Sequence, residues 1–282
     1  MLRRRRVDDR VDVAYRLLLG RDPDPAGRAD FSGRLARHEI SFEQMIEEIR
    51  TSEEFRFGRR LTDLSRSVHM SRCDFVQSLP PARRIVDLGG TNLWADDGAL
   101  VHMGYPYEFD DLVIVDLPPD ERHPLYRTAG DVDAVVSARG PVRYRYHSMT
   151  DLSGIDDGTV DLVYSGQSIE HVSEADGDVV LKEVWRILRP GGWLAVDTPN
   201  ARATRAQQAE FIDPDHEVEY THDQFVAKLA AAGFVVTRQH GLNFLGHSLA
   251  AGRFDLAEAA AHPGLFHQIE DCYILAYVAQ KP

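Results

Sequence analysis

Short apolar segments typical of buried strands alternate with segments of helical periodicity from residue 84 to the end of the chain. Strands of this kind, when helices connect them, favour a mostly parallel sheet that is covered by helices on both faces. The clearest helices are expected at 175–188 and 222–232. We therefore predict an α/β fold with seven strands, which are expected at 84–90, 111–117, 142–147, 160–165, 193–197, 234–237 and 273–278.

The first part of the chain has a different character. Apolar residues recur at helical spacing in three stripes between residues 8 and 57, and 20–27 is a breaker rich in glycine, proline and aspartate. Ser41 is the expected N-cap of the third helix. Residues 1–72 hold 16 basic and 13 acidic side chains, whereas residues 73–282 hold 16 and 32. This shift predicts a small helical domain, 1–72, followed by an α/β domain, 73–282.

The overall charge and composition exclude several classes of function. The chain has 32 basic and 45 acidic side chains, a net charge of −13, so it is a poor general binder of nucleic acids. No apolar run approaches the ~18 residues of a membrane span, and no signal peptide is expected. Two cysteines, Cys73 and Cys272, cannot form a disulfide framework or a four-cysteine zinc site. A reducing, cytoplasmic location is therefore expected.

Polar residues and glycines stand where the first two strands end. Asp87 precedes the pair Gly89 and Gly90, and Asp116 closes the second strand. Parallel α/β sheets bind ligands at the carboxyl ends of their strands, where a glycine admits close approach and a carboxylate accepts both hydroxyls of a ribose. The pattern indicates a nucleoside cofactor. Residues 91–94 lack the third glycine of a nicotinamide fingerprint, and no phosphate-binding P-loop is present.

The residues between 160 and 200 indicate which class of nucleoside-binding enzyme the sequence resembles. VDLVYSGQSIEHV at 160–172 leads into LKEVWRILRPGGWL at 181–194, which predicts an amphipathic helix, a Pro-Gly-Gly stop and a buried strand. DTPN follows at 197–200. This order resembles the class I S-adenosylmethionine (SAM)-dependent methyltransferases, over residues 82–240. The resemblance implies the Rossmann-like methyltransferase fold, with SAM as the cofactor.

The resemblance also implies which residues bind SAM. Thr91 and Leu93 replace two glycines of the family's first motif, so Asn92 is expected to adopt the left-handed turn conformation, and 95–110 is an insertion. The residues after the first strand would bind the methionine part of SAM. Those after the second and third strands would bind the ribose and the adenine, and those after the fourth strand would lie under the sulfonium. The residues implied are Asp87, Gly89, Gly90, Asn92, Asp116, Leu117, Ser148, Met149, Ser165, Gly166 and Gln167.

Methyl transfer to a sugar or alcohol hydroxyl needs a base, and the pKa of histidine lies near the operating pH. His171, beside Glu170 after the fourth strand, is the first candidate, followed by His147 and then His216. Four acids could hold a divalent ion such as magnesium, but we expect them to be solvated loop carboxylates and predict no metal site. They are Glu170, Asp213, Asp215 and Glu219.

The acceptor is inferred from the front segment. YRLLLGRDPDPAG, followed by a helix and by a helix ending in SEEF, resembles a small bacterial domain that accompanies enzymes of surface-polysaccharide synthesis, over roughly residues 8–57. Such a domain would act as a cap or as a dimerisation arm. Arginine makes up 29 of the 32 basic residues, as in actinobacteria with GC-rich genomes. We therefore predict an O-methyltransferase for a sugar hydroxyl of a glycan or glycan precursor, similar to the mycobacterial methylmannose-polysaccharide methyltransferases.

Two alternatives stay open at this stage. The chain could be a natural-product or lipid-quinone methyltransferase, because the sequence does not name the acceptor. It could also be a catalytically silent scaffold that binds the cofactor and uses its front helices as an interaction module. Residues 241–271, between the last two strands, are expected to cover an oligosaccharide or small-molecule acceptor or to form a subunit contact.

Overall fold

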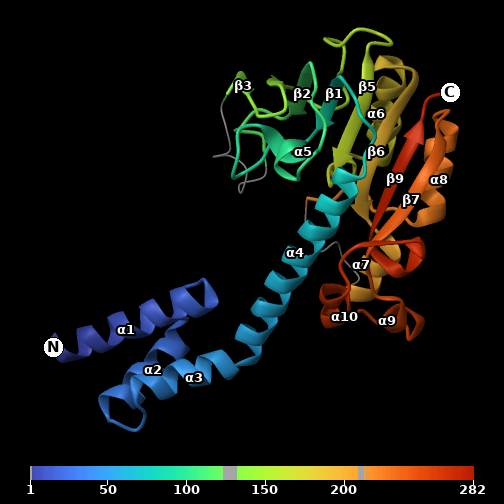
Figure 1. Ribbon diagram of the computed structural model, residues 1–282. Coiled ribbons are helices and arrows are strands. Elements are labelled where there is room, and N and C mark those ends of the chain that lie inside the picture. Colours follow the sequence, from blue (N-terminus) through green and yellow to red (C-terminus); the bar gives the residue numbers. More distant parts are fainter. Residues whose placement is uncertain (1, 123–131, 209–212, 214) are drawn as a thin grey trace. The chain divides into compact units, whose positions relative to one another are not determined.

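The computed structural model describes residues 2–122, 132–208, 213 and 215–282 (Figure 1). They form two compact units, 1–65 and 66–282. The boundary falls inside helix α4 (Glu53–Gln77), before residue 72, where the charge pattern had suggested it.

The first unit consists of α1 (Leu2–Leu19), α2 (Pro25–Ala36), α3 (Phe42–Thr51) and the beginning of α4. The prediction that Ser41 caps the third helix is confirmed: its side chain accepts a hydrogen bond from the Gln44 amide, and the Gln44 side chain accepts one from the Ser41 amide. The buried core of this unit is small, and it consists of Val11, Ala14, Tyr15, Met45 and Ile49.

The second unit is organised around one mixed sheet. Its nine described strands lie in the order β3-β4-β2-β1-β5-β6-β9-β7-β8, and the five from β4 to β6 pair in parallel. Val86 on the central strand lies opposite Val113 on one side and Val163 on the other. The strands are β1 Arg84–Leu88, β2 Asp111–Asp116, β3 Ala134–Val136, β4 Pro141–Tyr146, β5 Val160–Gly166, β6 Leu188–Pro199, β7 Val235–Phe244, β8 Leu265–Phe266 and β9 Cys272–Gln280.

The seven predicted strands are present, but the described sheet has nine strands and is mixed, so the description of a seven-stranded, mostly parallel sheet is not exact. The two additional strands, β3 and β8, are only three and two residues long, too short to show a periodicity in the sequence. Both pair antiparallel to their neighbours, and β9 inserts antiparallel between β6 and β7. The sheet is therefore parallel in its centre and antiparallel toward both edges.

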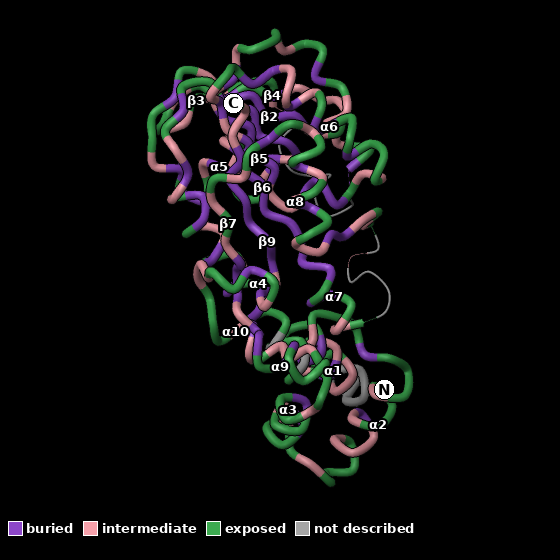
Figure 2. The backbone as a smooth tube through the Cα atoms, turned by 90° about the vertical axis from the view of Figure 1, so that its right-hand side faces the viewer, coloured by how far each residue is buried: buried purple, intermediate pink, exposed green. Residues whose placement is uncertain are grey.

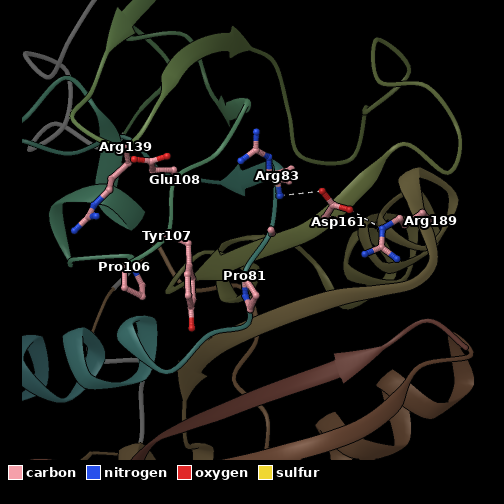
Figure 3. Close-up of a pocket in the computed structure, with 9 residues that line it drawn as sticks. Pro81, Arg83, Pro106, Tyr107, Glu108, Arg139, Asp161 and Arg189 are labelled. Carbon is pink, nitrogen blue, oxygen red and sulfur yellow. Dashed lines mark hydrogen bonds and ion pairs between the residues drawn. The ribbon is translucent and has the colours of Figure 1, made fainter.

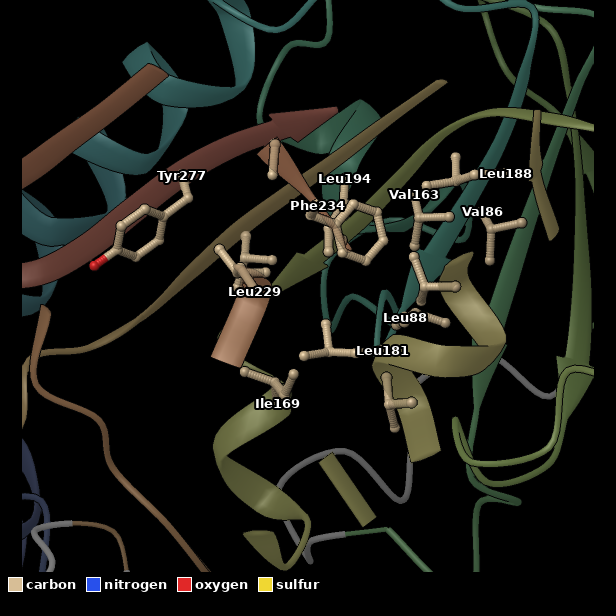
Figure 4. Close-up of a cluster of buried hydrophobic side chains, with 14 of the residues drawn as sticks. Val86, Leu88, Val163, Ile169, Leu181, Leu188, Leu194, Leu229, Phe234 and Tyr277 are labelled. Carbon is tan, nitrogen blue, oxygen red and sulfur yellow. The ribbon is translucent and has the colours of Figure 1, made fainter. Parts of the chain in front are cut away.

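Helices cover both faces of the sheet, as predicted. On one face, α6 (Glu174–Ile187) and α8 (His222–Ala231) pack on side chains such as Val86 and Leu88, and Leu181 and Leu229 fill the interface (Figure 4). Full burial of an aliphatic side chain of this size contributes roughly 1.5–3 kcal/mol. This contiguous cluster therefore fixes the strands whose ends carry the candidate site.

On the other face, α5 (Gly98–His102) and the C-terminal part of α4 cover Ile85 and its neighbours, with Phe75 and Leu100 in the interface. The central strands are buried along most of their length (Figure 2). Buried strands with covered faces leave only their ends accessible, which is where ligands bind in such sheets.

Shorter elements follow the carboxyl ends of the strands. They are the 3-10 helices η2 (Ile169–His171) and η3 (Ile269–Asp271), and α7 (Ala201–Gln207), α9 (Gly246–Ala250) and α10 (Leu256–Ala261). The last part of 241–271 packs on α4, because the Gly264 amide donates to the Ser71 hydroxyl. Within the described residues, no helix combines the length and the apolar character needed to cross a membrane.

Candidate functional site

The chain turns sharply after β1. Gly89 has a φ of +71°, and a Cβ placed on it would lie 2.8 Å from the Cβ of Ser168. A side chain is therefore excluded both by the left-handed backbone and by the close approach of the segment after β5. The turn brings the ends of β1 and β5 together, as expected for the two sides of a cofactor site.

Asp116 ends β2 next to this turn. Its Oδ2 accepts a hydrogen bond from the Thr91 amide at 3.1 Å, and its Oδ1 accepts one from the Leu117 amide at 2.7 Å. The Arg122 guanidinium lies 3.7 Å from Oδ1. The carboxylate is partly exposed, and its oxygens can accept further hydrogen bonds, so a hydroxyl pair can be bound there. The neighbouring Leu117 side chain is exposed.

The expected left-handed conformation of Asn92 is not found, because Asn92 is not among the residues with positive φ. Its side chain instead accepts a hydrogen bond from the Trp94 amide at 2.7 Å. Gly89 and Gly98 adopt the left-handed conformation in this segment. Asn92 thus shapes the loop through a local turn of its side chain and not through its own backbone.

Asp87 is more deeply placed than the sequence suggested. The residue is 1% exposed, Gly90 packs directly on its carboxyl group, and Oδ2 accepts a hydrogen bond from the Leu100 amide at the start of α5. Burial raises the pKa of Asp87 to about 8. Asp87 therefore fixes the turn and the start of α5 through buried contacts.

The raised pKa of Asp87 makes stability depend on pH. The folded chain favours the protonated carboxyl of Asp87, so this group stabilises the fold fully below pH 3.8, its ordinary pKa. That contribution to the free energy of unfolding is lost as the pH rises through about 8. We expect Asp87→Asn to be more stable than wild type by at least ~1 kcal/mol at pH 9, and the advantage should shrink at pH 5. Urea unfolding of both proteins at the two pH values measures this. An equal pH dependence of the two proteins would contradict it.

The residues after β4 make local contacts. The Ser148 and Thr150 hydroxyls lie 2.8 Å apart, and Met149 packs against the core on the α6 face. His147 precedes them, and in the sheet β2 and β1 separate β4 from β5. Three strand spacings correspond to ~14 Å. His147 therefore stands away from the residues that follow β5.

The segment after β5 has a strained backbone. Gln167 has a φ of +53°, a conformation that is uncommon outside glycine. Its amide donates to the Asp197 carbonyl at 2.8 Å, and Ser165 and Ser168 join through their hydroxyls at 2.7 Å. Gly166 has no room for a side chain, because the Tyr164 hydroxyl lies above it. Strain that neighbouring contacts maintain is typical of functional sites.

A hydrogen-bonded network that was not predicted from the sequence lies beneath this segment. Asp197 on β6 is fully buried and accepts hydrogen bonds from Arg72 Nε at 2.7 Å, the Tyr164 hydroxyl at 2.5 Å and Gln167 Nε2 at 3.0 Å. The charge of Asp197 raises the pKa of Arg72 although burial opposes it. The network therefore holds the strained Gln167 in place from inside the sheet.

Glu170, His171 and His216 come together beyond β5. The two imidazole rings pack edge to face with centroids 4.9 Å apart. His171 Nδ1 lies 3.1 Å from the Asp215 carbonyl, and His216 Nδ1 lies 2.7 Å from Glu219 Oε1. Two of the three sequence-predicted histidines thus share one cluster with Glu170, on η2 and on the segment before α8.

The surroundings of Glu170, His171 and His216 shift the pKa values of these three side chains in different directions. Burial raises the pKa of Glu170 to about 7, and desolvation lowers the pKa of His171. Desolvation also lowers the pKa of His216, but its hydrogen bond to Glu219 and the charge of Glu170 outweigh this, and the net shift is upward. The cluster therefore shifts the pKa values of its two imidazoles in opposite directions, downward for His171 and upward for His216.

The prediction that the four acids of this region are solvated is wrong for two of them. Glu170 is fully buried, and Glu219 is 4% exposed and accepts a hydrogen bond from the Thr204 hydroxyl. Asp215 is exposed and Asp213 partly so. The buried pair surrounds His216 with negative charge.

A pocket of about 200 Å³ opens beside this cluster at the carboxyl ends of β5 and β6. Polar and apolar atoms contribute about equally to its wall, and its volume is below the ~300–1,000 Å³ of sites for drug-sized ligands. It suits a small polar group. The lining residues are Gln167, Pro199, Thr204, Asp213, His216, Glu219, Tyr273 and Ile274.

A larger pocket of about 560 Å³ lies at the opposite, amino ends of the strands (Figure 3). Arg83 and Arg189 flank Asp161 there, and Tyr107 and Arg139 line the other side. Because α/β sheets bind their ligands at the carboxyl ends, this pocket is not the cofactor site.

The comparisons with known proteins agree with this fold. Residues 111–196 match the family described as "Methyltransferase domain". A protein of Mycolicibacterium smegmatis named "Probable S-adenosylmethionine-dependent methyltransferase" is 35% identical over 118 residues, which are 42% of this chain and 44% of that protein. A Mycobacterium tuberculosis protein of similar name is 35% identical over 88 residues, 31% of each chain. The chain thus matches less than half the length of these curated relatives.

Two solved structures show the same fold. A SAM-dependent methyltransferase of Thermotoga maritima has a TM-score of 0.53 at 17% identity and covers 80% of this chain and 95% of its own. A Haloferax volcanii methyltransferase, solved with the Trm112 activator, has a TM-score of 0.52 at 18% identity and covers 80% and 94%. At these identities the likeness shows the fold alone.

Proposed function

We propose that the chain transfers a methyl group from SAM to a hydroxyl of a sugar, in a glycan or a glycan precursor. The match of residues 111–196 to the methyltransferase domain family supports the methyl transfer. The observation that carries this proposal is the position of the Glu170, His171 and His216 cluster. It stands beside a small pocket whose wall includes Asp213 and Glu219, at the carboxyl ends of the strands, where such sheets bind their ligands.

The residues around the turn after β1 fit SAM. Gly89 leaves a cradle that a Cβ would fill, and Asp116 offers a fixed carboxylate for the ribose hydroxyls. Leu117 presents an exposed apolar surface for the adenine. When bound, SAM supplies an electrophilic methyl carbon on a sulfonium, and the protein has to orient the acceptor oxygen toward it.

The cluster would activate the acceptor. His171 Nδ1 is held at the Asp215 carbonyl, which favours the tautomer with the proton on Nδ1 and leaves Nε2 as the basic nitrogen. Its lowered pKa keeps the ring neutral and able to accept a proton at pH 7. Carboxylates and amides in the pocket wall, such as Asp213 and Gln167, suit the hydroxyl-rich surface of a sugar.

Asp116→Ala tests the cofactor assignment. Loss of the charged acceptor for the ribose is expected to raise the Kd of the demethylated product, S-adenosylhomocysteine, by roughly 10- to 150-fold, since hydrogen bonds to charged groups contribute ~1.5–3 kcal/mol. Isothermal titration measures the change, with Asp120→Ala, an exposed acid on the same loop, as the control. No binding by wild type, or tight NADH binding instead, would refute the assignment.

We assign the first unit a role in dimerisation or as a cap. It has its own small core and resembles a domain that accompanies polysaccharide-synthesis enzymes, which also supports the sugar acceptor. Light scattering of a chain that begins at residue 66 is expected to show a change of oligomeric state or solubility, with cofactor binding retained. An unchanged monomer that loses only acceptor affinity would instead assign glycan binding to this unit.

A further inference from the structure

We propose that Glu170, His171 and His216 bind one divalent transition-metal ion. A carboxylate oxygen of Glu170 and one ring nitrogen of each histidine lie within 4.8 Å of one another. Ligands held ~2.0–2.2 Å from a common ion are ~3–4 Å apart, so a small closure of the side chains completes the site.

Glu170 supplies an independent indication. The residue is fully buried, Oε2 accepts a hydrogen bond from the Thr198 hydroxyl at 3.1 Å, and Oε1 has no hydrogen-bond partner among the described residues. A buried acceptor without a partner costs ~1–3 kcal/mol. A proton on Oε1 would not remove this cost, because the resulting hydroxyl would need an acceptor of its own. A cation would.

Each histidine has a hydrogen-bond partner at Nδ1 of the kind that metal-binding histidines have. A ligating imidazole commonly donates its other N–H to a carboxylate or to a backbone carbonyl, which fixes the ring and its tautomer. His216 has Glu219 at Nδ1, and His171 has the Asp215 carbonyl there. With Nδ1 held in this way, Nε2 is the ring nitrogen that would take the metal in each case.

The donor set favours particular ions. Two imidazoles with one carboxylate suit zinc, cobalt, manganese or iron better than magnesium or calcium, which prefer oxygen ligands. The charges of Glu170 and Glu219 together balance a divalent cation. Because His171 is exposed and His216 lines the small pocket, coordination positions toward the pocket stay open for an acceptor hydroxyl.

This role deepens the proposed function and rests on it. It replaces the base role of His171, because Nε2 would then bind the ion and could not accept the proton. Coordination lowers the pKa of the acceptor hydroxyl, which then loses its proton to solvent water. The acceptor oxygen forms a bond to the methyl carbon of SAM, and the carbon–sulfur bond breaks with its electron pair left on sulfur. The products are a methyl ether, S-adenosylhomocysteine and one proton.

A second group of possible ligands provides a matched control. His222, Asp223 and Glu270 also lie within 4.8 Å of one another, but Asp223 and Glu270 are exposed and His222 Nδ1 pairs with the Tyr277 hydroxyl. Among the residues that the structure describes, no buried polar atom without a partner points to a ligand at this place, and we assign no metal to it.

The test is titration of the full-length, chelator-treated protein with Co²⁺, followed by ligand-field absorption and calorimetry without SAM or acceptor. Wild type is expected to bind one Co²⁺ per chain. Glu170→Gln and His171→Ala should each weaken binding at least 10-fold, and Glu219→Gln by ~10- to 100-fold through the ring of His216. His222→Ala should bind like wild type. Circular dichroism and unchanged S-adenosylhomocysteine affinity show that a variant is folded.

Several results would overturn the metal site: no Co²⁺ binding above that of Glu170→Gln, loss of binding in His222→Ala alone, or full methyl transfer by protein shown to be metal-free. The last result would leave the proposed function intact. Wild type that binds Co²⁺ with the expected variant pattern but transfers no methyl group would support the site and refute the proposed function.

Discussion

Replacing Arg72 with methionine is expected to lower the free energy of unfolding by about 3–5 kcal/mol, because the substitution leaves the fully buried Asp197 carboxylate without its charge partner. The remaining donors, the Tyr164 hydroxyl and Gln167 Nε2, are neutral and cannot balance the charge. Urea unfolding monitored by circular dichroism measures the loss.

The control for this prediction is Arg66→Met, an exposed position on the same helix, which should stay within about 0.5 kcal/mol of wild type. The double variant Arg72→Met with Asp197→Asn should recover part of the loss, since no unpaired charge is then buried. A loss below ~1 kcal/mol in Arg72→Met would mean that water or a rearrangement neutralises Asp197. The network would then not be what holds the strained Gln167.

Turnover is expected to fall at least ~10²-fold in His171→Ala, while cofactor affinity stays within a few-fold of wild type. The lost imidazole acts on the acceptor proton, directly or as a metal ligand, and its contribution is realised in the transition state. Steady-state kinetics together with titration of S-adenosylhomocysteine separate the two effects.

His102→Ala, an exposed histidine at the end of α5, is the matched control and should retain full turnover. Turnover within ~3-fold of wild type in His171→Ala, with a collapse in His147→Ala, would transfer the role of the base to the end of β4. If single alanine variants of His147, His171 and His216 all keep full activity, a phenol or carboxylate acceptor would replace the sugar.

The central strands were predictable because each is a run of apolar residues, and the helices between them because their apolar residues recur at helical spacing. The short β3 and β8 carry no such signal, and the antiparallel insertion of β9 depends on pairing between distant segments. Residues at the carboxyl ends of parallel strands meet by geometry alone, which is why Gly89, Asp116, Glu170 and His171 could be placed at one edge of the sheet from the sequence.

The depth of each side chain could not be predicted. Asp87 was expected to line the cofactor and Glu219 to be solvated, but the packing of α5 and of the segment before α8 buries them. Asp197 is the last residue of a predicted strand, but its partner Arg72 lies 125 residues away in a helix. Ion pairs over such separations leave no signal in a single sequence.

Transfer of a radiolabelled methyl group from SAM to a panel of mono- and disaccharides tests the central claim most directly, with the products identified by mass spectrometry. The full-length protein is expected to form an O-methyl sugar and S-adenosylhomocysteine in equal amounts, and His171→Ala should form at least ~10²-fold less per unit time. Binding of S-adenosylhomocysteine without transfer to any sugar, or transfer to a quinone or phenol alone, would contradict the proposed sugar O-methyltransferase.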